Sequence, residues 1–346
     1  MDNIIKKCLI LLLSLAALFV FILALRNTNE APPDIPDTGK DIFGLIPPGD
    51  VMDMAFIKDA VYAGGRDGVY VIDRNNYQAE KLEFSTNITY VRALHADDEG
   101  WLWIGCTQGL MRYFPETKEE NRIIAEKESI PDERVNSIMQ DSKKRLWVGT
   151  WGGAACLEDG KWSVLTEDDG LMKNMVNVID EDSEGGLWFG SYSVKEGGVS
   201  CLSNGQWQYF NTQTHLHNEN VTSIMQAHNG DVWIGTGLYD HGGAAILRLD
   251  GFVWKLFGKM AKEDGLVGEK VRSLFQTREG TVIIGSEYNG LTCVKNGICS
   301  HLTMAEGLSD NEIKCILQDK EGRIWLGTRN GITVIANEEA LFNKNP

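Results

Sequence analysis

The chain contains 346 residues, of which 43% are hydrophobic and 24% are charged, and its formal net charge at pH 7 is -16. These values are typical of one soluble domain of about 300 residues that carries a short extension. The excess of negative charge argues against nucleic acid or anionic lipid as a partner of the folded part.

Residues 1–25 have the pattern of a membrane segment. Lys6 and Lys7 precede an uncharged apolar run of 18 residues, Cys8 to Leu25, which is just long enough to cross a bilayer as a helix. The two lysines before this run, against Arg26 after it, favour a cytoplasmic N-terminus. We therefore predict a transmembrane or signal-anchor helix with the rest of the chain extracytoplasmic, in the periplasm or outside the cell. The alternative is a cleaved signal peptide, which would leave the protein secreted.

Residues 26–40 contain three prolines, several acidic residues and almost nothing that a core would bury. This composition predicts an extended or disordered spacer. The spacer would hold the folded part away from the membrane.

A short motif containing glycine and, in most copies, tryptophan recurs seven times from residue 61 to residue 335. A second register accompanies it, because an apolar residue such as Val135 or Val176 lies 14 positions before the glycine in six copies. Repeats of about 40 to 50 residues are typical of propeller blades. The seven motif glycines are Gly64, Gly105, Gly149, Gly190, Gly235, Gly285 and Gly327.

Each repeat reads as four short strands separated by polar turns, which is the pattern of a strand meander. One such sheet cannot bury both of its faces, whereas seven sheets packed around an axis form a continuous core. We therefore predict an all-β fold over residues 41–340, a seven-bladed β-propeller of four-stranded blades, followed by a tail over residues 341–346. The tryptophans of the motif are expected to pack between the sheets.

The two ends of the repeat region are each incomplete. The last repeat stops after its third strand, Gly331 to Ile335, while an unassigned apolar segment, Ile42 to Ile46, precedes the first repeat. We expect residues 41–47 to supply the fourth strand of the last blade, which would close the ring.

The segments Val135 to Gly153 and Ile313 to Gly331 resemble the two-component regulator propeller repeat, and the resemblance extends over residues 41–340. It implies an extracytoplasmic sensor of the kind found in hybrid histidine kinases, where the propeller recognises breakdown products of polysaccharides. No kinase segment accompanies the propeller in this sequence. The resemblance therefore implies the sensor part alone, with a signalling partner at the membrane.

The loops between the second and third strands vary in length and should open on one face, here called the upper face. They lengthen from four residues to eight in the fourth and fifth repeats and to five in the sixth. Elaborated loops on a rigid scaffold commonly bind ligands, and aromatic and polar side chains there suit an oligosaccharide or another small polar ligand. Arg66 and Arg329 would be neighbours in a closed ring and could clamp a carboxylate or sulfate. The candidate ligand-binding residues are Arg66, Trp151, Tyr192, Lys195, Glu196, Tyr239, Asp240, His241, Glu287, Tyr288, Asn289 and Arg329.

Three other interpretations compete with this one. The candidate residues could be ordinary solvated loop residues, or the upper face could dock another protein or a cell-wall polymer. His215, His217 and His241 could hold a metal or supply a general base for lyase or hydrolase chemistry. Because their spacing is weak evidence, we predict no catalytic residue, no metal and no cofactor, and hence no enzyme. The recurrent D-x-x-G segments are interpreted as hairpin turns and not as calcium sites.

Cys156, Cys201 and Cys293 occupy the same place in the third strand of their repeats, where other repeats carry aliphatic residues. This equivalence predicts small buried side chains. Cys293 and Cys299 flank a turn, so a disulfide across that hairpin is one possibility.

Overall fold

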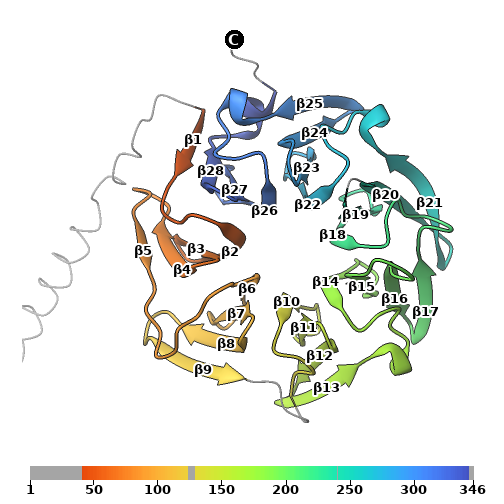
Figure 1. Cartoon of the computed structure of the whole chain (residues 1–346), viewed down its shortest axis with the longest axis horizontal. Helices are drawn as coiled ribbons and strands as arrows, with labels where there is room; N and C mark the ends of the chain where they lie inside the picture. Colours follow the sequence, from red (N-terminus) through yellow and green to blue (C-terminus); the bar gives the residue numbers. More distant parts are fainter. Residues whose placement is uncertain (1–40, 124–128, 240, 343–346) are drawn as a thin grey trace, which may run out of the picture. The chain divides into compact units, whose positions relative to one another are not determined.

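The computed structural model describes residues 41–123, 129–239 and 241–342. These residues form seven four-stranded antiparallel sheets arranged as a ring, as Figure 1 shows. The predicted all-β, seven-bladed propeller is thereby confirmed. The predicted anchor and spacer, residues 1–40, lie outside the described residues. Within the described part of the chain, no helix is long and apolar enough to cross a membrane.

The blades are numbered in chain order, and each is given from its innermost to its outermost strand. Blades 1 to 4 consist of β2 (Val51–Ile57), β3 (Ala60–Gly65), β4 (Gly68–Asp73) and β5 (Ala79–Lys81); β6 (Ala93–Ala96), β7 (Leu102–Cys106), β8 (Gly109–Phe114) and β9 (Glu119–Ile123); β10 (Val135–Gln140), β11 (Leu146–Thr150), β12 (Gly153–Glu158) and β13 (Lys161–Leu165); and β14 (Val176–Glu181), β15 (Leu187–Ser191), β16 (Val199–Ser203) and β17 (Gln206–Phe210).

Blades 5 to 7 follow the same order. They consist of β18 (Val221–Gln226), β19 (Val232–Leu238), β20 (His241–Asp250) and β21 (Val253–Met260); β22 (Val271–Gln276), β23 (Val282–Ser286), β24 (Leu291–Lys295) and β25 (Ile298–Leu302); and β26 (Ile313–Gln318), β27 (Ile324–Thr328), β28 (Gly331–Ile335) and β1 (Ile42–Leu45). The described residues also include the 3-10 helices η2 (Glu167–Asp169), η3 (Lys262–Asp264), η4 (Met304–Glu306) and η5 (Glu338–Leu341).

The ring closes through β1, the first described strand of the chain. It pairs antiparallel with β28, and the register places Ile42 opposite Ile335 and Leu45 opposite Ile332. Blade 7 therefore contains one strand from the start of the propeller and three from its end, as the incomplete last repeat predicts. Figure 1 shows β1 at the outer edge of that blade.

The second strand of each blade carries the sequence motif and lies in the core. All five residues of β11 are buried, and Trp147 packs edge-on against Phe189 of blade 4, with ring centroids 5.6 Å apart. The motif glycine has a separate task, because a Cβ atom added to Gly235 would lie 2.6 Å from Val271 Cγ1 of blade 6. Glycine is required there because the neighbouring blade approaches so closely.

The aspartate that opens the turn between the first two strands is a structural tether, both in the D-x-x-G turns and in the corresponding Asp-Ser-Lys-Lys turn of blade 3. Asp141 accepts hydrogen bonds from Trp147 Nε1 (2.9 Å), from Arg145 Nε (2.6 Å) and from the backbone N–H groups of Lys143 and Arg145. Asp182 and Asp319 make the same contact with the tryptophans of their blades. The acidic residue thus fastens the turn between the first two strands to the core, which explains the motif without a metal.

Substituting Gly235 by Ala should lower the free energy of unfolding by about 1–3 kcal/mol, because the added methyl group overlaps Val271. In the double variant Gly235→Ala, Val271→Ala, the clash is removed, so the two losses should be less than additive. Urea unfolding of the two single variants and the double variant measures this coupling. Strict additivity would contradict the proposed contact.

Removing residues 41–47 should lower the thermal midpoint far more than removing residues 1–35, because only the first deletion takes β1 away from β28 and exposes an edge strand. Differential scanning calorimetry of the two truncated chains makes the comparison. Equal midpoints would show that β1 does not hold the ring closed.

Substituting Asp141 by Asn should cost about 2 kcal/mol at pH 7, because it removes hydrogen bonds to a buried carboxylate. Burial is the largest single influence and raises the pKa of Asp141, yet the hydrogen bonds from Trp147 and Arg145 together hold that pKa below its ordinary value. The stabilisation by the ionised form is therefore present at neutral pH and is lost as pH falls through that lowered pKa.

Urea unfolding at pH 7 and near pH 3 tests this dependence. The difference in free energy of unfolding between the parent chain and Asp141→Asn should be smaller at the acidic pH. Asp168→Asn is the matched control, since Asp168 is exposed in η2 and its loss should change neither curve. A gap that is constant with pH would refute the assigned role of the carboxylate.

Candidate functional site: an axial cavity on the upper face

A cavity of about 440 Å³ opens where the innermost strands begin. Each of the seven blades contributes one residue to its wall, always the residue directly after the apolar residue of the second sequence register. Trp151, Tyr192 and Asn220 complete the lining. The seven contributed residues are Met52, Arg92, Asn136, Asn177, Thr222, Arg272 and Lys314.

A β-bulge explains why these side chains reach the cavity. In blade 3, Val135 pairs with Thr150 and Ser137 pairs with Gly149, so Asn136 is the extra residue of the bulge. The same register shift occurs at the start of the innermost strand in blades 1, 4, 5, 6 and 7. A bulge breaks the strict alternation of side chains and redirects one of them, here toward the cavity.

The uncharged polar residues of the wall also join neighbouring blades. Asn136 Nδ2 donates to the carbonyl of Val176 (3.0 Å), Asn177 Nδ2 to that of Val221 (2.7 Å) and Thr222 Oγ1 to that of Val271 (2.6 Å). These three side chains therefore have a structural role that is independent of any ligand.

Two aromatic side chains form part of the rim. The rings of Trp151 and Tyr192 are nearly parallel, with an angle of 8° between their planes and 6.4 Å between their centroids. The guanidinium of Arg134 lies 4.1 Å from the centre of the Trp151 ring and is paired with Asp132. Flat aromatic faces next to amide groups suit a ring-shaped polar ligand.

The cavity contains three cationic side chains, from Arg92, Arg272 and Lys314. Lys314 forms an ion pair with Asp50, and Glu312 lies 3.8 Å from Lys314 Nζ and 3.7 Å from Arg272. Burial raises the pKa of Glu312 above its ordinary value, although both cations oppose that shift. The carboxylates of Asp50 and Glu312 stand behind the wall and do not line it.

Of the twelve residues singled out from the sequence, Trp151 and Tyr192 line this cavity. Asp240 lies outside the described residues. The other nine belong to the surrounding upper-face loops or their partners, and several are engaged there: Glu196 with Lys173, Glu287 with Lys270, Tyr288 beneath the Lys270 ammonium, and Arg66 over the Tyr90 ring. The backbone N–H of Asn289 donates to Ser286 Oγ, and Lys195, Tyr239, His241 and Arg329 are exposed.

The sequence interpretation missed Arg92, Asn136, Asn177, Asn220, Thr222, Arg272 and Lys314. A signal for six of them was present, because each directly follows the apolar residue of the second register and is polar in a strand otherwise read as core. The lengths of the loops pointed to residues at the rim of the cavity, whereas the residues of its wall lie within the repeats themselves.

His215 and His217 have different neighbours. His215 Nδ1 contacts Thr214 Oγ1, and the ring of His217 lies against Gly243. The pKa of each is lowered, first by burial and then by Lys259. Over residues 41–123, 129–239 and 241–342, no group of three or more His, Cys, Asp or Glu side chains is arranged to hold a metal.

Cys293 and Cys299 do not form the disulfide that the sequence left as a possibility. In the β24–β25 hairpin, Cys293 lies opposite Ser300 and Cys299 opposite Val294, so the two thiols project from different faces of the sheet. Both are free, and Cys156, Cys201 and Cys293 are buried, as predicted. Burial raises the pKa of the Cys293 thiol to about 12.

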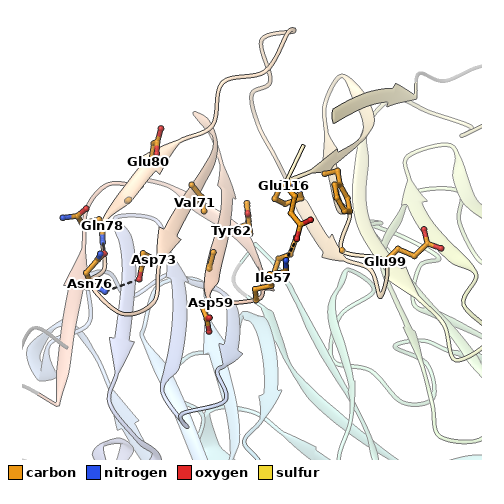
Figure 2. A pocket seen from close by; sticks show the side chains of 16 residues that line it. Ile57, Asp59, Tyr62, Val71, Asp73, Asn76, Gln78, Glu80, Glu99 and Glu116 are labelled. Carbon is orange, nitrogen blue, oxygen red and sulfur yellow. Dashed lines mark hydrogen bonds and ion pairs between the residues drawn. The ribbon is translucent and has the colours of Figure 1, made fainter. Parts of the chain in front are cut away.

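A second concavity of about 600 Å³ lies between the lower turns of blades 1 and 2. Figure 2 shows its wall, which includes the apolar side chains of Ile57, Tyr62 and Val71 and acidic side chains such as Glu80 and Glu99. It lies on the face opposite the axial cavity, since the turns that form it connect the first strand to the second and the third to the fourth.

The ring of blades and its axial cavity define a seven-bladed β-propeller with a polar cavity on its axis. The family model described as "two component regulator propeller" matches residues 129–152, 215–237 and 307–330. These segments fall in blades 3, 5 and 7, so the chain carries repeats of this family, as the resemblance implies. No curated protein matches the chain.

Solved structures show the same fold. The extracellular domain described as part of a hybrid two component system from B. thetaiotaomicron superposes with a TM-score of 0.69 at 20% identity, covering 85% of this chain and 41% of that one. A second extracellular domain from B. thetaiotaomicron, described as part of a one component system, gives the same score and identity and is covered over 39% of its length. The chain thus spans about two fifths of these two proteins.

A streptogramin B lyase structure has a TM-score of 0.63 at 14% identity, over 85% of this chain and 95% of that one. The same architecture therefore serves both sensory and catalytic proteins. Function has to be argued from the site.

Proposed function

We propose that this protein is an extracytoplasmic, sensor-type propeller that binds a small polar ligand in the axial cavity and passes its occupancy to a partner. The observation that carries the proposal is the wall itself, to which every blade contributes one side chain. A ligand that contacts several blades at once can bias how they pack, which is what a sensor needs. The family repeats and the two extracellular domains of similar fold support the sensory role and the extracytoplasmic location.

The chemistry of the cavity favours an oligosaccharide fragment as the ligand. Trp151 and Tyr192 offer aromatic faces for a sugar ring, while Asn177, Thr222 and Asn220 offer groups that hydrogen-bond to its hydroxyls. Concave sites with aromatic walls and a few convergent polar groups are the usual form of small-molecule sites. The predicted N-terminal helix would tether the sensor to the membrane, where a signalling partner could respond.

Docking of a macromolecule is the second candidate function, and the lower concavity between blades 1 and 2 favours it. Its wall combines apolar side chains with the carboxylates of Glu80 and Glu99, and Glu116 there is paired with Lys58. Such a groove suits a basic segment of another protein. The two functions are compatible, because the two concavities lie on opposite faces.

Thermal-shift screening of the full-length purified chain against polysaccharide fragments tests the proposal. A ligand at about 100 times its dissociation constant should add roughly 2.7 kcal/mol to the free energy of unfolding, which raises the melting midpoint visibly. The ligand should be recovered intact, whereas recovery of a cleaved product would favour the lyase or hydrolase alternative. No shift across the panel would favour docking.

For a fragment that binds, Trp151→Ala should weaken affinity about tenfold, equivalent to about 1.4 kcal/mol. Tyr209→Ala is the matched control, because Tyr209 is an exposed aromatic residue on β17, away from the cavity. This variant should bind the fragment with the affinity of the parent chain. Loss of binding in Tyr239→Ala with Trp151→Ala unaffected would move the site to the loop of blade 5.

A further inference from the structure

The charge of the axial cavity is opposite to that of the whole chain. The chain carries a net charge of -16, yet the cavity is lined by three cationic side chains and, among the described residues, by no carboxylate. The three cations come from blades 2, 6 and 7, so only the closed ring brings them together. A positive concavity in an acidic protein attracts anions selectively.

Lys314 is neutralised by the protein, whereas Arg272 has only a long contact with a carboxylate. The Lys314 side chain is 7% exposed and is held by Asp50, and Glu312 is shared between it and Arg272. Because Lys314 already pairs with Asp50, Glu312 is left mainly to Arg272, and their distance of 3.7 Å is long for an ion pair. Arg272, which is 30% exposed, keeps most of its hydrogen-bonding capacity.

Arg92 is not neutralised by the protein at all. Its side chain donates one hydrogen bond, to Asn136 Oδ1 at 3.0 Å, and no carboxylate pairs with it within the described ranges. Burial lowers the pKa of Arg92, and the positive charges of Arg272 and Arg134 lower it further. A half-buried guanidinium in a positive field is unfavourable unless an anion occupies the site, and its planar fork matches carboxylate or sulfate oxygens.

An unsatisfied acceptor in the same wall gives independent evidence for a ligand. Asn220 is 3% exposed and lines the cavity. Its Nδ2 donates to the carbonyl of Gly237 at 2.7 Å, but its Oδ1 is buried without a hydrogen-bond partner. Leaving a buried acceptor unpaired costs about 1–3 kcal/mol, and a hydroxyl group of a ligand would remove that cost.

We propose that the axial cavity is an anion site, in which a carboxylate or sulfate group of the ligand binds to Arg92 with the support of Arg272 and Lys314. A hydroxyl of the same ligand donates to Asn220 Oδ1. The ligand class is then an acidic, hydroxyl-bearing ring such as a uronic acid or a sulfated sugar. This inference rests on the proposed function and deepens it. It also places the anion deep in the cavity and not between Arg66 and Arg329 at the rim.

Titration calorimetry of the full-length chain with paired probes tests the anion site. The probes are trigalacturonate and its methyl ester, which differ in charge but hardly in shape, sulfated and unsulfated N-acetylglucosamine, and sodium sulfate alone. The acidic member of a pair should bind at least tenfold more tightly than its neutral partner. Sodium sulfate should compete with it.

Arg92→Gln should weaken binding of the acidic probe at least tenfold and leave the neutral probe within about twofold. Arg122→Gln is the matched control, because it removes the same charge from the same blade at β9, where Arg122 donates to the Gln108 carbonyl. Near-identical circular dichroism spectra and melting midpoints for the two variants exclude misfolding as the cause.

Neutral probes that bind as tightly as acidic ones, or an Arg92→Gln variant that binds the acidic probe normally, would overturn the anion site and leave the proposed function standing. If every acidic probe fails at millimolar concentration while a neutral fragment binds, the anion site is likewise overturned. Failure of all probes, acidic and neutral, would count against both the anion site and the proposed function.

Discussion

The structure depends on one contact that is repeated around the ring. The glycine in the second strand of each blade faces an apolar residue at or just before the start of the innermost strand of the next blade, at a distance that leaves no room for a Cβ atom. The seventh contact joins the last blade to the first, so the ring closes with the same interaction that propagates it. The pairs are Gly64 with Val91, Gly105 with Val135, Gly149 with Val176, Gly190 with Val221, Gly235 with Val271, Gly285 with Ile313, and Gly327 with Val51.

This contact also determines where the cavity lies. The apolar residue is fixed against the neighbouring blade, and in six blades the residue after it is the extra residue of a bulge. Its side chain is therefore directed away from the interface between blades. Asn136, Asn177 and Thr222 use this position to tie one blade to the next, whereas Arg92, Arg272 and Lys314 bring charge to it. Packing and binding are thus served by adjacent residues in the same strand.

The fold could be predicted from the sequence because it rests on local features that recur. The glycines, the tryptophans and the polar turns each have a short-range cause, and the incomplete last repeat points to β1 as its missing strand. The cavity could be predicted only in part. Trp151 and Tyr192 were found because they follow the motif in loops, but Arg92 and Arg272 meet only after the ring has closed. The ion pairs of Asp50 and Glu312 with Lys314 and Arg272 form only when the ring closes. The same is true of the environment that leaves Asn220 Oδ1 unpaired. Neither feature has a sequence signature.

The residues that follow the apolar residue at the start of each blade allow the ligand specificity of the cavity to be changed one blade at a time. Each blade places one side chain of this position in a common space, so a point substitution in one blade changes one sector of the wall. Asn136, Asn177 and Thr222 are constrained by hydrogen bonds to the next blade. Arg92, Arg272 and Lys314 are constrained by their contacts with Asn136, Glu312 and Asp50. In proteins of this architecture, a few substitutions at these wall positions can therefore change the ligand while the fold stays the same.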